Sequence, residues 1–318
     1  MCDKVLVLHE GEMLSFDTKE EALRLHPSLE DYFFGPRCGT RRAPSSCEPG
    51  AGALGQAGVW LSVVRRMWME TFLSSLSNEL FKLRRRKKYL VFLILGCAIC
   101  VISALRVLLV NYLTDGSVDP AAVLGGLMSS NLTFILLIFL PLMAVMAASD
   151  LFVAEQADHT IRFSLMRPVG KGKLFFSKAL AVFVLCAFDL AVMYLVTTLA
   201  QVGLGGGTEG VLASLGACLL DLIPLAVLIL FFCLVNQVGR GSGLTVLLCV
   251  VCYIGLLVLG TYLPAVGGLV FTGYLRWHNL WIGITLPFFS LLPRIGLLAG
   301  YGLVFGCGGY WLFDRKEA

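Results

Sequence analysis

Two acidic residues lie in the middle of long apolar runs, where an ionisable side chain is unusual. Asp189 falls within the run Ala179–Ala200, and Asp221 falls within Leu212–Val235. If each run is a helix across a membrane, a rise of ~1.5 Å per residue places both carboxyl groups about 14–15 Å deep, close to the midplane. Acidic groups at this depth form ion or substrate paths, or contacts between helices. The equal alternative is a pair of protonated carboxyls bonded to backbone or hydroxyl groups.

Histidine and cysteine side chains, which bind metals and haem, do not gather into a recognisable site. The four histidines lie in the N-terminal tail or between apolar runs: His9, His26, His159 and His278. Two Cys-x-x-Cys pairs, Cys97/Cys100 and Cys249/Cys252, make a four-thiolate site geometrically conceivable. Because a charged cluster is costly in hydrocarbon, we expect these thiols to pack as small apolar groups, with no metal or cofactor. The chain also lacks Gly-x-Ser-x-Gly and His-Glu-x-x-His, so it is not predicted to be an enzyme.

Six apolar runs must position these residues. They are Tyr89–Val110, Leu127–Ala148, Ala179–Ala200, Leu212–Val235, Leu244–Leu263 and Leu291–Phe313. Each reaches roughly the 20 residues that a helix needs to cross ~30 Å of hydrocarbon. Hydrophobic residues make up 58% of the chain, above the ~45–50% of soluble domains. We therefore predict an all-α membrane protein with six transmembrane helices.

The basic residues give these helices an orientation. Fourteen Lys and Arg residues lie near one set of run ends, whereas the other set of loops holds only Arg276. The positive-inside rule then places both termini in the cytoplasm and the protein in the cell membrane. Because this topology accounts for the net charge of +4, no nucleic-acid partner is needed. Membrane lipids are the expected surroundings.

Two arginines, Arg106 and Arg294, fall toward the outer ends of their runs. The favoured interpretation is that both side chains extend to the outer interface, where the charge stays in water. The sharper alternative is that they hold an anionic headgroup or a substrate. Asp189, Asp221, Arg106 and Arg294 are therefore the candidate polar residues within the membrane.

The chain before the first run divides into three segments. Residues 1–34 have a soluble character, with a strand at Val5–Leu8 and a helix start at Thr18. Residues 35–59 are rich in Gly, Pro, Ala and Ser and are predicted to be a flexible linker. Residues 60–88 hold an amphipathic helix, Trp60–Leu83, followed by a basic cluster. We expect this helix to lie in the cytoplasmic headgroup region, or else to pack as a soluble helix on another element. Residues 89–318 form the six-span domain.

The long cytoplasmic loop between the second and third runs combines both charge signs with apolar residues. Its candidate contact residues are Glu155, Asp158, Thr160, Arg162, Leu165, Met166, Arg167 and Pro168. A short helix with these charges could bind a surface groove of a soluble partner, with Leu165 and Met166 as apolar anchors. Pro168 would end that helix, since the residue before a proline avoids the α region. The alternative is a solvated loop whose basic residues only fix the topology.

This loop, the amphipathic helix and the six-run topology resemble the permease subunits of type-2 ABC (ATP-binding cassette) exporters over about residues 61–318. The aromatic, nearly uncharged stretch Pro264–Ser290 fits as well. The resemblance implies that the loop carries a coupling helix that docks into an ATPase, and that Trp60–Leu83 is an elbow helix. It implies export of an amphipathic or lipid-like substrate or a peptide antibiotic. Two permeases, identical or different, would work with two ABC ATPase subunits that bind ATP and Mg.

The N-terminal segment resembles a different subunit. Residues 2–14 are similar to the strand pair that follows the switch histidine in ABC ATPases, and Leu29–Phe33 to the C-terminal tail of such a subunit. The chain has no Gly-x-x-x-x-Gly-Lys-Ser/Thr phosphate loop and no Leu-Ser-Gly-Gly signature. We interpret the segment as a remnant, a fusion scar or the product of a misplaced start codon. Residues 1–60 are expected to be dispensable for membrane insertion and assembly.

One alternative function stays open at this point. An ion-coupled secondary transporter could use Asp189 and Asp221 as a proton site, although the sequence shows no evident repeat halves. Dependence on an ATPase partner distinguishes the exporter from this carrier.

Overall fold

The structure is a computed structural model, and it describes residues 4–9, 12–18, 69, 71–113, 120–157, 170–204, 211–239, 241–263, 267–276 and 288–316. The chain divides into two compact units, Met1–Trp60 and Leu61–Ala318. The finer division into four segments stays a prediction.

The first unit contains an antiparallel strand pair. Strand β1 (Lys4–His9) pairs with β2 (Glu12–Thr18), with Lys4 opposite Thr18 and an irregularity between Val7 and Leu8. The strand predicted at Val5–Leu8 is confirmed as part of β1. The helix predicted from Thr18 onward lies outside the described residues, and the resemblance of this unit to an ATPase tail stays a prediction.

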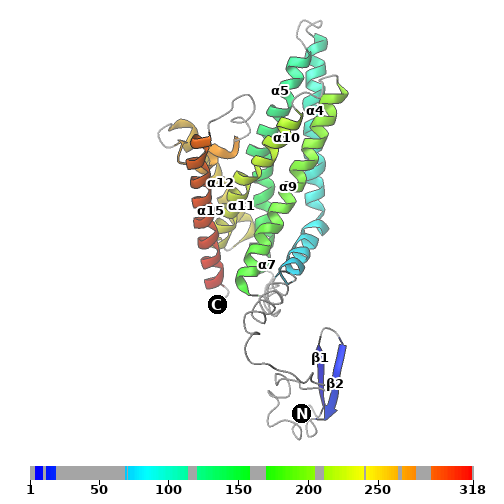
Figure 1. The fold of residues 1–318 in the computed structure, drawn as a ribbon, viewed down its shortest axis with the longest axis vertical. Coiled ribbons are helices and arrows are strands. Elements are labelled where there is room, and N and C mark those ends of the chain that lie inside the picture. The colour runs from blue at the N-terminus through cyan, green and yellow to red at the C-terminus, as the bar shows by residue number, and fades with distance from the viewer. Residues whose placement is uncertain are drawn as a thin grey trace, which may run out of the picture. The chain divides into compact units, whose positions relative to one another are not determined.

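In the second unit, every described element is a helix, and six of the described helical stretches are long and apolar enough to cross a membrane. The first is α4 (Lys87–Leu113), the third α9 (Lys171–Gly203), the fifth α12 (Ser242–Tyr262) and the sixth α15 (Phe288–Lys316). The second joins α5 (Pro120–Phe134), η1 (Ile135–Phe139), α6 (Leu140–Ser149) and η2 (Asp150–Ala154), and is followed by α7 (Glu155–Ala157). The fourth joins α10 (Val211–Leu220) and α11 (Leu222–Val238). Figure 1 shows these helices running side by side. The predicted all-α fold with six membrane-spanning helices is confirmed.

Two predicted boundaries were wrong. The second span continues to Ala154 instead of ending at Ala148, and the third begins at Lys171 instead of Ala179. In both places charged residues lower the local hydropathy without ending the helix, because Asp150 and Lys178 are buried beside oppositely charged groups.

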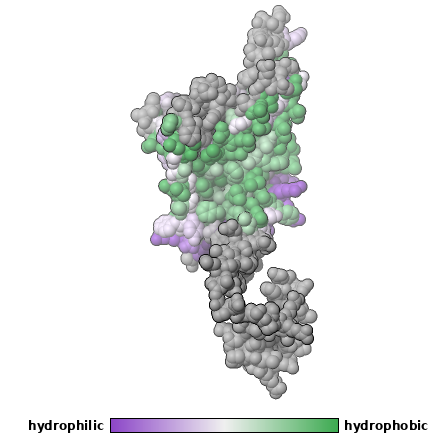
Figure 2. Space-filling view, in the orientation of Figure 1, coloured by the Kyte–Doolittle hydropathy of each residue, from purple (hydrophilic) through white to green (hydrophobic). Residues whose placement is uncertain are grey.

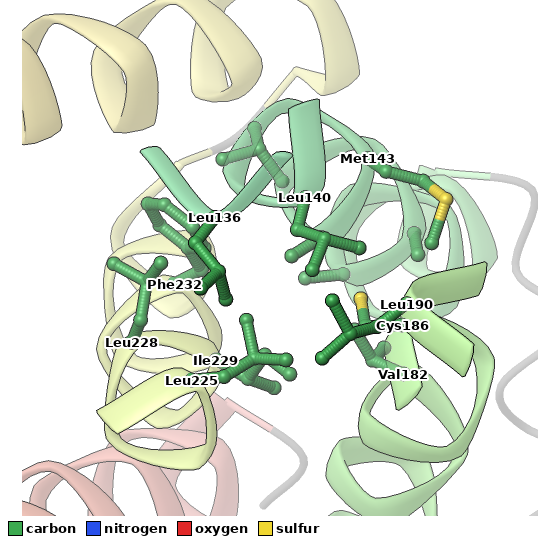
Figure 3. Close-up of a cluster of buried hydrophobic side chains, with 14 of the residues drawn as sticks. Leu136, Leu140, Met143, Val182, Cys186, Leu190, Leu225, Leu228, Ile229 and Phe232 are labelled. Carbon is green, nitrogen blue, oxygen red and sulfur yellow. The ribbon is translucent and has the colours of Figure 1, made fainter. Parts of the chain in front are cut away.

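The second and fourth spans form the centre of the bundle. About 67% of the apolar window of the second span and 56% of that of the fourth is buried, against 17% for the fifth and for the sixth. Figure 3 shows the core that results, in which side chains from three spans point toward one another. Leu136, Leu140 and Met143 come from the second span, Val182, Cys186 and Leu190 from α9, and Leu225, Leu228, Ile229 and Phe232 from α11. Because lipid tails are as apolar as leucine, such contacts stabilise the bundle through close packing.

The outer surface of the bundle is apolar in a broad band. Large hydrophobic side chains of α4, α12 and α15 are exposed there, for example Ile94, Val251 and Leu303. Figure 2 shows this band, with hydrophilic residues gathered toward one end of it. We call that end the basic end. It is defined by Arg84, Arg85, Lys87, Lys88, Lys171, Lys173, Arg315 and Lys316.

A helical segment precedes the first span and lies at an angle to it (Figure 1). Residues 71–85 are helical, the helix breaks at Arg86, and α4 begins at Lys87. One face, with Leu83 fully buried and Leu76 and Leu80 partly buried, packs on the core of the bundle. The other face exposes apolar side chains such as Leu73 and Phe81. Of the amphipathic helix predicted over Trp60–Leu83, residues 71–83 are helical and pack on the bundle through their inner face, whereas most of the earlier part lies outside the described residues.

A short 3-10 helix, η3 (Phe271–Arg276), returns between the fourth, fifth and sixth spans. Phe271 is buried against the rings of Phe231, Tyr301 and Phe305. The Thr272 hydroxyl donates to the Leu256 carbonyl of α12 at 3.3 Å. This part of the aromatic segment is thus packed against protein, which is how backbone outside long helices is tolerated at membrane depth.

Candidate functional site

The structure describes one of the eight loop residues proposed as contacts for a partner. Glu155 begins α7 at the end of the second span. The other seven, Asp158, Thr160, Arg162, Leu165, Met166, Arg167 and Pro168, lie outside the described residues. The coupling helix therefore stays a prediction, but the two helix ends that carry the loop are described.

The Glu155 side chain is turned into the bundle. It is buried, and its Oε2 lies 2.5 Å from Lys178 Nζ of α9. Its Oε1 lies 2.9 Å from Lys82 Nζ of the helical segment 71–85. Glu155 was expected to offer its charge to a soluble partner. In the structure the carboxylate instead connects three elements of its own chain.

A fourth residue, Glu79, completes this cluster. Glu79 is 1% exposed and accepts a hydrogen bond from Lys82 Nζ at 2.9 Å through Oε1. Its Oε2 lies 3.5 Å from Lys178 Nζ, within ion-pair distance but without a hydrogen bond. We call these four residues (Glu79, Lys82, Glu155 and Lys178) the ionic junction. Two acids and two bases balance, which is the condition under which buried charges are tolerated.

Opposite charges keep two members of the junction, Glu155 and Lys82, in the ionised state. Burial by itself would raise the pKa of Glu155, but the Lys178 and Lys82 ammonium groups together bring its pKa below the ordinary value. Burial would likewise lower the pKa of Lys82, but the Glu79 and Glu155 carboxylates raise it above its ordinary value. Both groups are therefore charged at neutral pH.

Lys178 makes a further contact that depends on irregular helix geometry. Its Nζ donates to the Leu151 carbonyl at 2.9 Å. Leu151 lies in η2, a π-helical stretch that follows α6 directly. Such stretches disturb the regular hydrogen-bond ladder and recur at functional sites. The fully buried Lys178 ammonium thus binds both the backbone and the side chains at the end of the second span.

A second cluster lies beside the first, around Asp150. Its carboxylate accepts a hydrogen bond from the Tyr89 hydroxyl and lies 2.9 Å from Arg86 Nη1 and 2.5 Å from Lys88 Nζ. Arg86 is the residue at which the helix breaks before α4. Asp150 therefore fixes the bend between segment 71–85 and the first span to the end of the second span.

The intramembrane acids are both buried, but in different settings. Asp189 lies in continuous helix α9, and its Oδ2 has no hydrogen-bond partner among the described residues. Asp221 lies at the break between α10 and α11, three positions before Pro224. The break agrees with the missing N–H of a proline, which interrupts the helical ladder. That the two carboxyls face each other stays a prediction.

The two arginines occupy more open positions. Arg106 is exposed on α4 and Arg294 is partly exposed near the start of α15. An exposed arginine fits a side chain that extends toward an interface. Binding of a headgroup or substrate there stays a prediction.

The thiols and the other candidate metal ligands do not converge in the part of the chain that the structure describes. No group of three or more His, Cys, Asp and Glu side chains there could hold a metal ion. Cys100 and Cys249 are buried free thiols, and Cys97 and Cys252 are partly exposed ones.

Sequence reasoning singled out Glu155 but missed its partners. The only local signal was Glu79 and Lys82, three positions apart on one helix, a spacing at which side chains meet. Lys178 directly precedes the apolar run Ala179–Ala200, and nothing in the sequence indicates that it is buried, since lysine is almost never fully buried unless it is paired.

A comparison with protein families places these elements in a known context. The family model described as ABC-2 family transporter protein matches residues 75–297. The match begins in the helical segment before α4, includes the ionic junction and ends in α15. A search among curated proteins finds no match. The family model covers more than half of the chain, from the helical segment before α4 to the first turns of α15. The chain therefore belongs to the ABC-2 family of transporter proteins and is an ABC permease subunit.

Proposed function

We propose that this chain is the transmembrane permease of an ATP-driven exporter whose ATP is hydrolysed by separate ABC ATPase subunits. The family match over residues 75–297 carries the proposal. ATP and Mg would be bound by the ATPase, and the chain itself would bind no cofactor. The family match gives no support to an ion-coupled carrier built on Asp189 and Asp221.

The ionic junction supports a mechanical role for the loop between the second and third spans. Glu155 lies just before that loop, Lys178 lies in the second turn of α9 after it, and the two side chains are joined at 2.5 Å. Lys82 adds the helical segment 71–85 to the same cluster. A force applied to the loop by an ATPase would therefore reach three elements together. The proposed coupling residues are Asp158, Thr160, Arg162, Leu165, Met166, Arg167 and Pro168, with Glu155 as their anchor.

The basic end is proposed to face the cytoplasm. In the sequence, fourteen basic residues flank the apolar runs on this side, whereas the loops of the other side hold only Arg276. This asymmetry supports an orientation with both termini inside the cell and the protein in the cell membrane. An amphipathic or lipid-like molecule or a peptide antibiotic is the proposed substrate class, since the bundle offers a mainly apolar surface. Two permeases, identical or different, would combine with two ATPases.

Affinity purification of the full chain from its native membrane tests the proposal. We expect an ABC ATPase to be purified with it, as identified by mass spectrometry. Arg162→Glu should release the ATPase by reversing a charge at the proposed docking surface, while the chain stays folded. Arg84→Glu is the matched control, because Arg84 is an exposed basic residue of the same end. Purification without any ATPase, or equal loss with both variants, would contradict the proposal.

A further inference from the structure

An apolar groove opens on the side of the bundle near the basic end. Its volume is about 360 Å³, and it lies between the helical segment 71–85, α9 and α11. Phe72 comes from the first of these, Phe176, Leu180 and Phe183 from α9, and Ile229 and Leu230 from α11. Phe176 is 47% exposed, so the groove is open to the surroundings of the bundle.

The groove lies at the depth of one leaflet. Phe176 and Phe183 lie about 8 and 18 Å along α9 from Lys171 at the basic end. On the antiparallel α11, Leu230 and Ala226 lie about 12 and 18 Å from Val238 at the same end. The lining residues of the two helices therefore cover overlapping depths, from about 8 to about 18 Å from the basic end, which is close to the ~15 Å that one leaflet contributes to the hydrocarbon.

A cation lies at the polar end of the groove. Lys173 precedes Phe176 and Leu180 at helical spacing, so it lies on the same face of α9. Its Nζ donates to the Thr71 hydroxyl at 3.2 Å, and Thr71 directly precedes Phe72 in the lining. The other side of this polar end is closed by the buried hydrogen bond between the Ser75 and Ser177 hydroxyls at 3.0 Å. A positive charge at the polar end of an apolar groove is complementary to an anionic amphiphile, which has a negative headgroup and an apolar chain.

We propose that this groove binds one acyl chain of an anionic phospholipid from the leaflet at the basic end, with the lipid phosphate at Lys173 and Thr71. A lysine near the surface attracts anionic lipid, and the Thr71 hydroxyl can donate to a phosphate oxygen. The inference goes beyond the proposed function and does not depend on an ATPase partner. Bound lipid would fill the space between segment 71–85 and the third and fourth spans, next to the ionic junction.

Photo-crosslinking in lipid nanodiscs tests the site. The full chain is reconstituted in phosphatidylcholine with a trace of phosphatidylglycerol that carries a diazirine on its acyl chain, and in parallel with the matching phosphatidylcholine probe. We expect the phosphatidylglycerol probe to label the peptides around Leu180 and Leu230 more strongly than the other probe. Ala226→Phe, which fills the groove, should abolish this labelling. Ala299→Phe, at an exposed position of α15, should not.

The polar end is tested separately by variants that leave the groove intact. Lys173→Gln should reduce phosphatidylglycerol labelling about fivefold, the effect of one lysine near a membrane surface, and Lys173→Arg should retain it. Lys171→Gln is the control, because the Lys171 ammonium lies 3.3 Å from Asp314 at the same end. Equal labelling by both probes, labelling unchanged in Ala226→Phe and Lys173→Gln, or crosslinks from the groove to a second copy of the chain would each overturn the proposal.

Discussion

A single lysine shows how this protein keeps charge inside a membrane-spanning helix. Lys178 is fully buried, yet its ammonium contacts Glu155, Glu79 and the Leu151 carbonyl. Such a group is stable only with its partners, because removing one side of a buried ion pair leaves an uncompensated charge. The residue therefore ties its helix to the end of the second span and to the segment before the first.

Replacing this lysine measures the strength of the junction. Lys178→Met should lower the free energy of unfolding by about 3–5 kcal/mol, because Glu155 and Glu79 lose a buried counter-charge. Lys171→Met is the comparison, since Lys171 and Asp314 form an exposed pair worth ~0–1 kcal/mol. Unfolding in mixed micelles with increasing denaturing detergent gives both values. Similar losses in the two variants would show that the junction is no stronger than a surface ion pair.

The junction also predicts a dependence on acid. The pKa of Glu155 lies below its ordinary value of 4.5 in the folded protein, so its contribution to stability is fully present above that pH. The contribution is lost as the pH falls through the folded pKa. As the pH falls below 4.5, the unfolding midpoint should decline less steeply in Glu155→Gln than in the unmodified chain. Asp314→Asn, which removes an exposed carboxylate, should keep the steep decline.

At the scale of elements, the second span contains two π-helical stretches whose carbonyl groups are bound by other helices. In η1 and α6, Pro141 has no N–H to donate to the Leu137 carbonyl four positions earlier. The Tyr253 hydroxyl of α12 donates to that carbonyl at 2.7 Å. In η2, Lys178 binds the Leu151 carbonyl in a similar way. The irregular backbone of the second span is thus satisfied by the third and fifth spans.

The Tyr253 contact can be tested by a double-mutant cycle. Tyr253→Phe should cost about 1–3 kcal/mol, because the partly buried Leu137 carbonyl loses its donor. In a Pro141→Ala background the cost should be smaller, since the alanine N–H can serve the same carbonyl. Tyr262→Phe, at a tyrosine that is 79% exposed, should change stability by less than about 0.5 kcal/mol. Full additivity of Tyr253→Phe and Pro141→Ala would contradict this account.

Close packing of the sixth span depends on one glycine. A Cβ at Gly309 would lie 2.8 Å from Phe175 Cζ and 3.6 Å from the Leu234 backbone. Phe175 cannot move aside easily, since the rings of Phe152 and Phe313 lie 5.5 and 5.8 Å from it. Small residues allow helices in a membrane to approach in this way.

Adding one methyl group at this position should therefore loosen the bundle. Gly309→Ala is expected to destabilise the chain by about 1–3 kcal/mol through overpacking. Gly300→Ala is the matched control on the same helix, because a Cβ there meets nothing within 4 Å. It should be neutral or stabilising by less than about 1 kcal/mol. Thermal aggregation midpoints of the two purified variants make the comparison, and a stable Gly309→Ala would show that the packing at Phe175 is adaptable.

For the whole molecule, hydropathy predicted the six spans because each is a continuous apolar stretch, from α4 to α15. The limits of the third span were missed because Lys171, Lys173 and Lys178 make its first turns appear polar. The ionic junction could not be predicted, since Lys82 and Glu155 meet only through folding, at a sequence separation of 73. The η2 stretch carries no proline, so nothing in its sequence indicates π-helical geometry.

In the whole permease, ion pairs join the elements at the basic end into one structural unit. The ionic junction joins segment 71–85 with the second and third spans, and the Asp150 cluster adds the start of the first span. The predicted coupling loop lies between Glu155 and Lys178, at the point where these elements meet. In this account an ATPase that acts on the loop moves these connected elements together and, through them, the core of the bundle.

ATP hydrolysis by the purified complex tests this account most directly. The complex of the full chain with its ATPase partner, reconstituted in lipid, should hydrolyse ATP in a vanadate-sensitive manner. The chain alone should not hydrolyse ATP. Substrate should raise the rate of ATP hydrolysis in the unmodified complex. In a Lys178→Met complex that still contains the ATPase, this increase should be lost, because the loop is no longer fixed to the bundle. A chain that transports without an ATPase, or a Lys178→Met complex with unchanged coupling, would contradict the central claim.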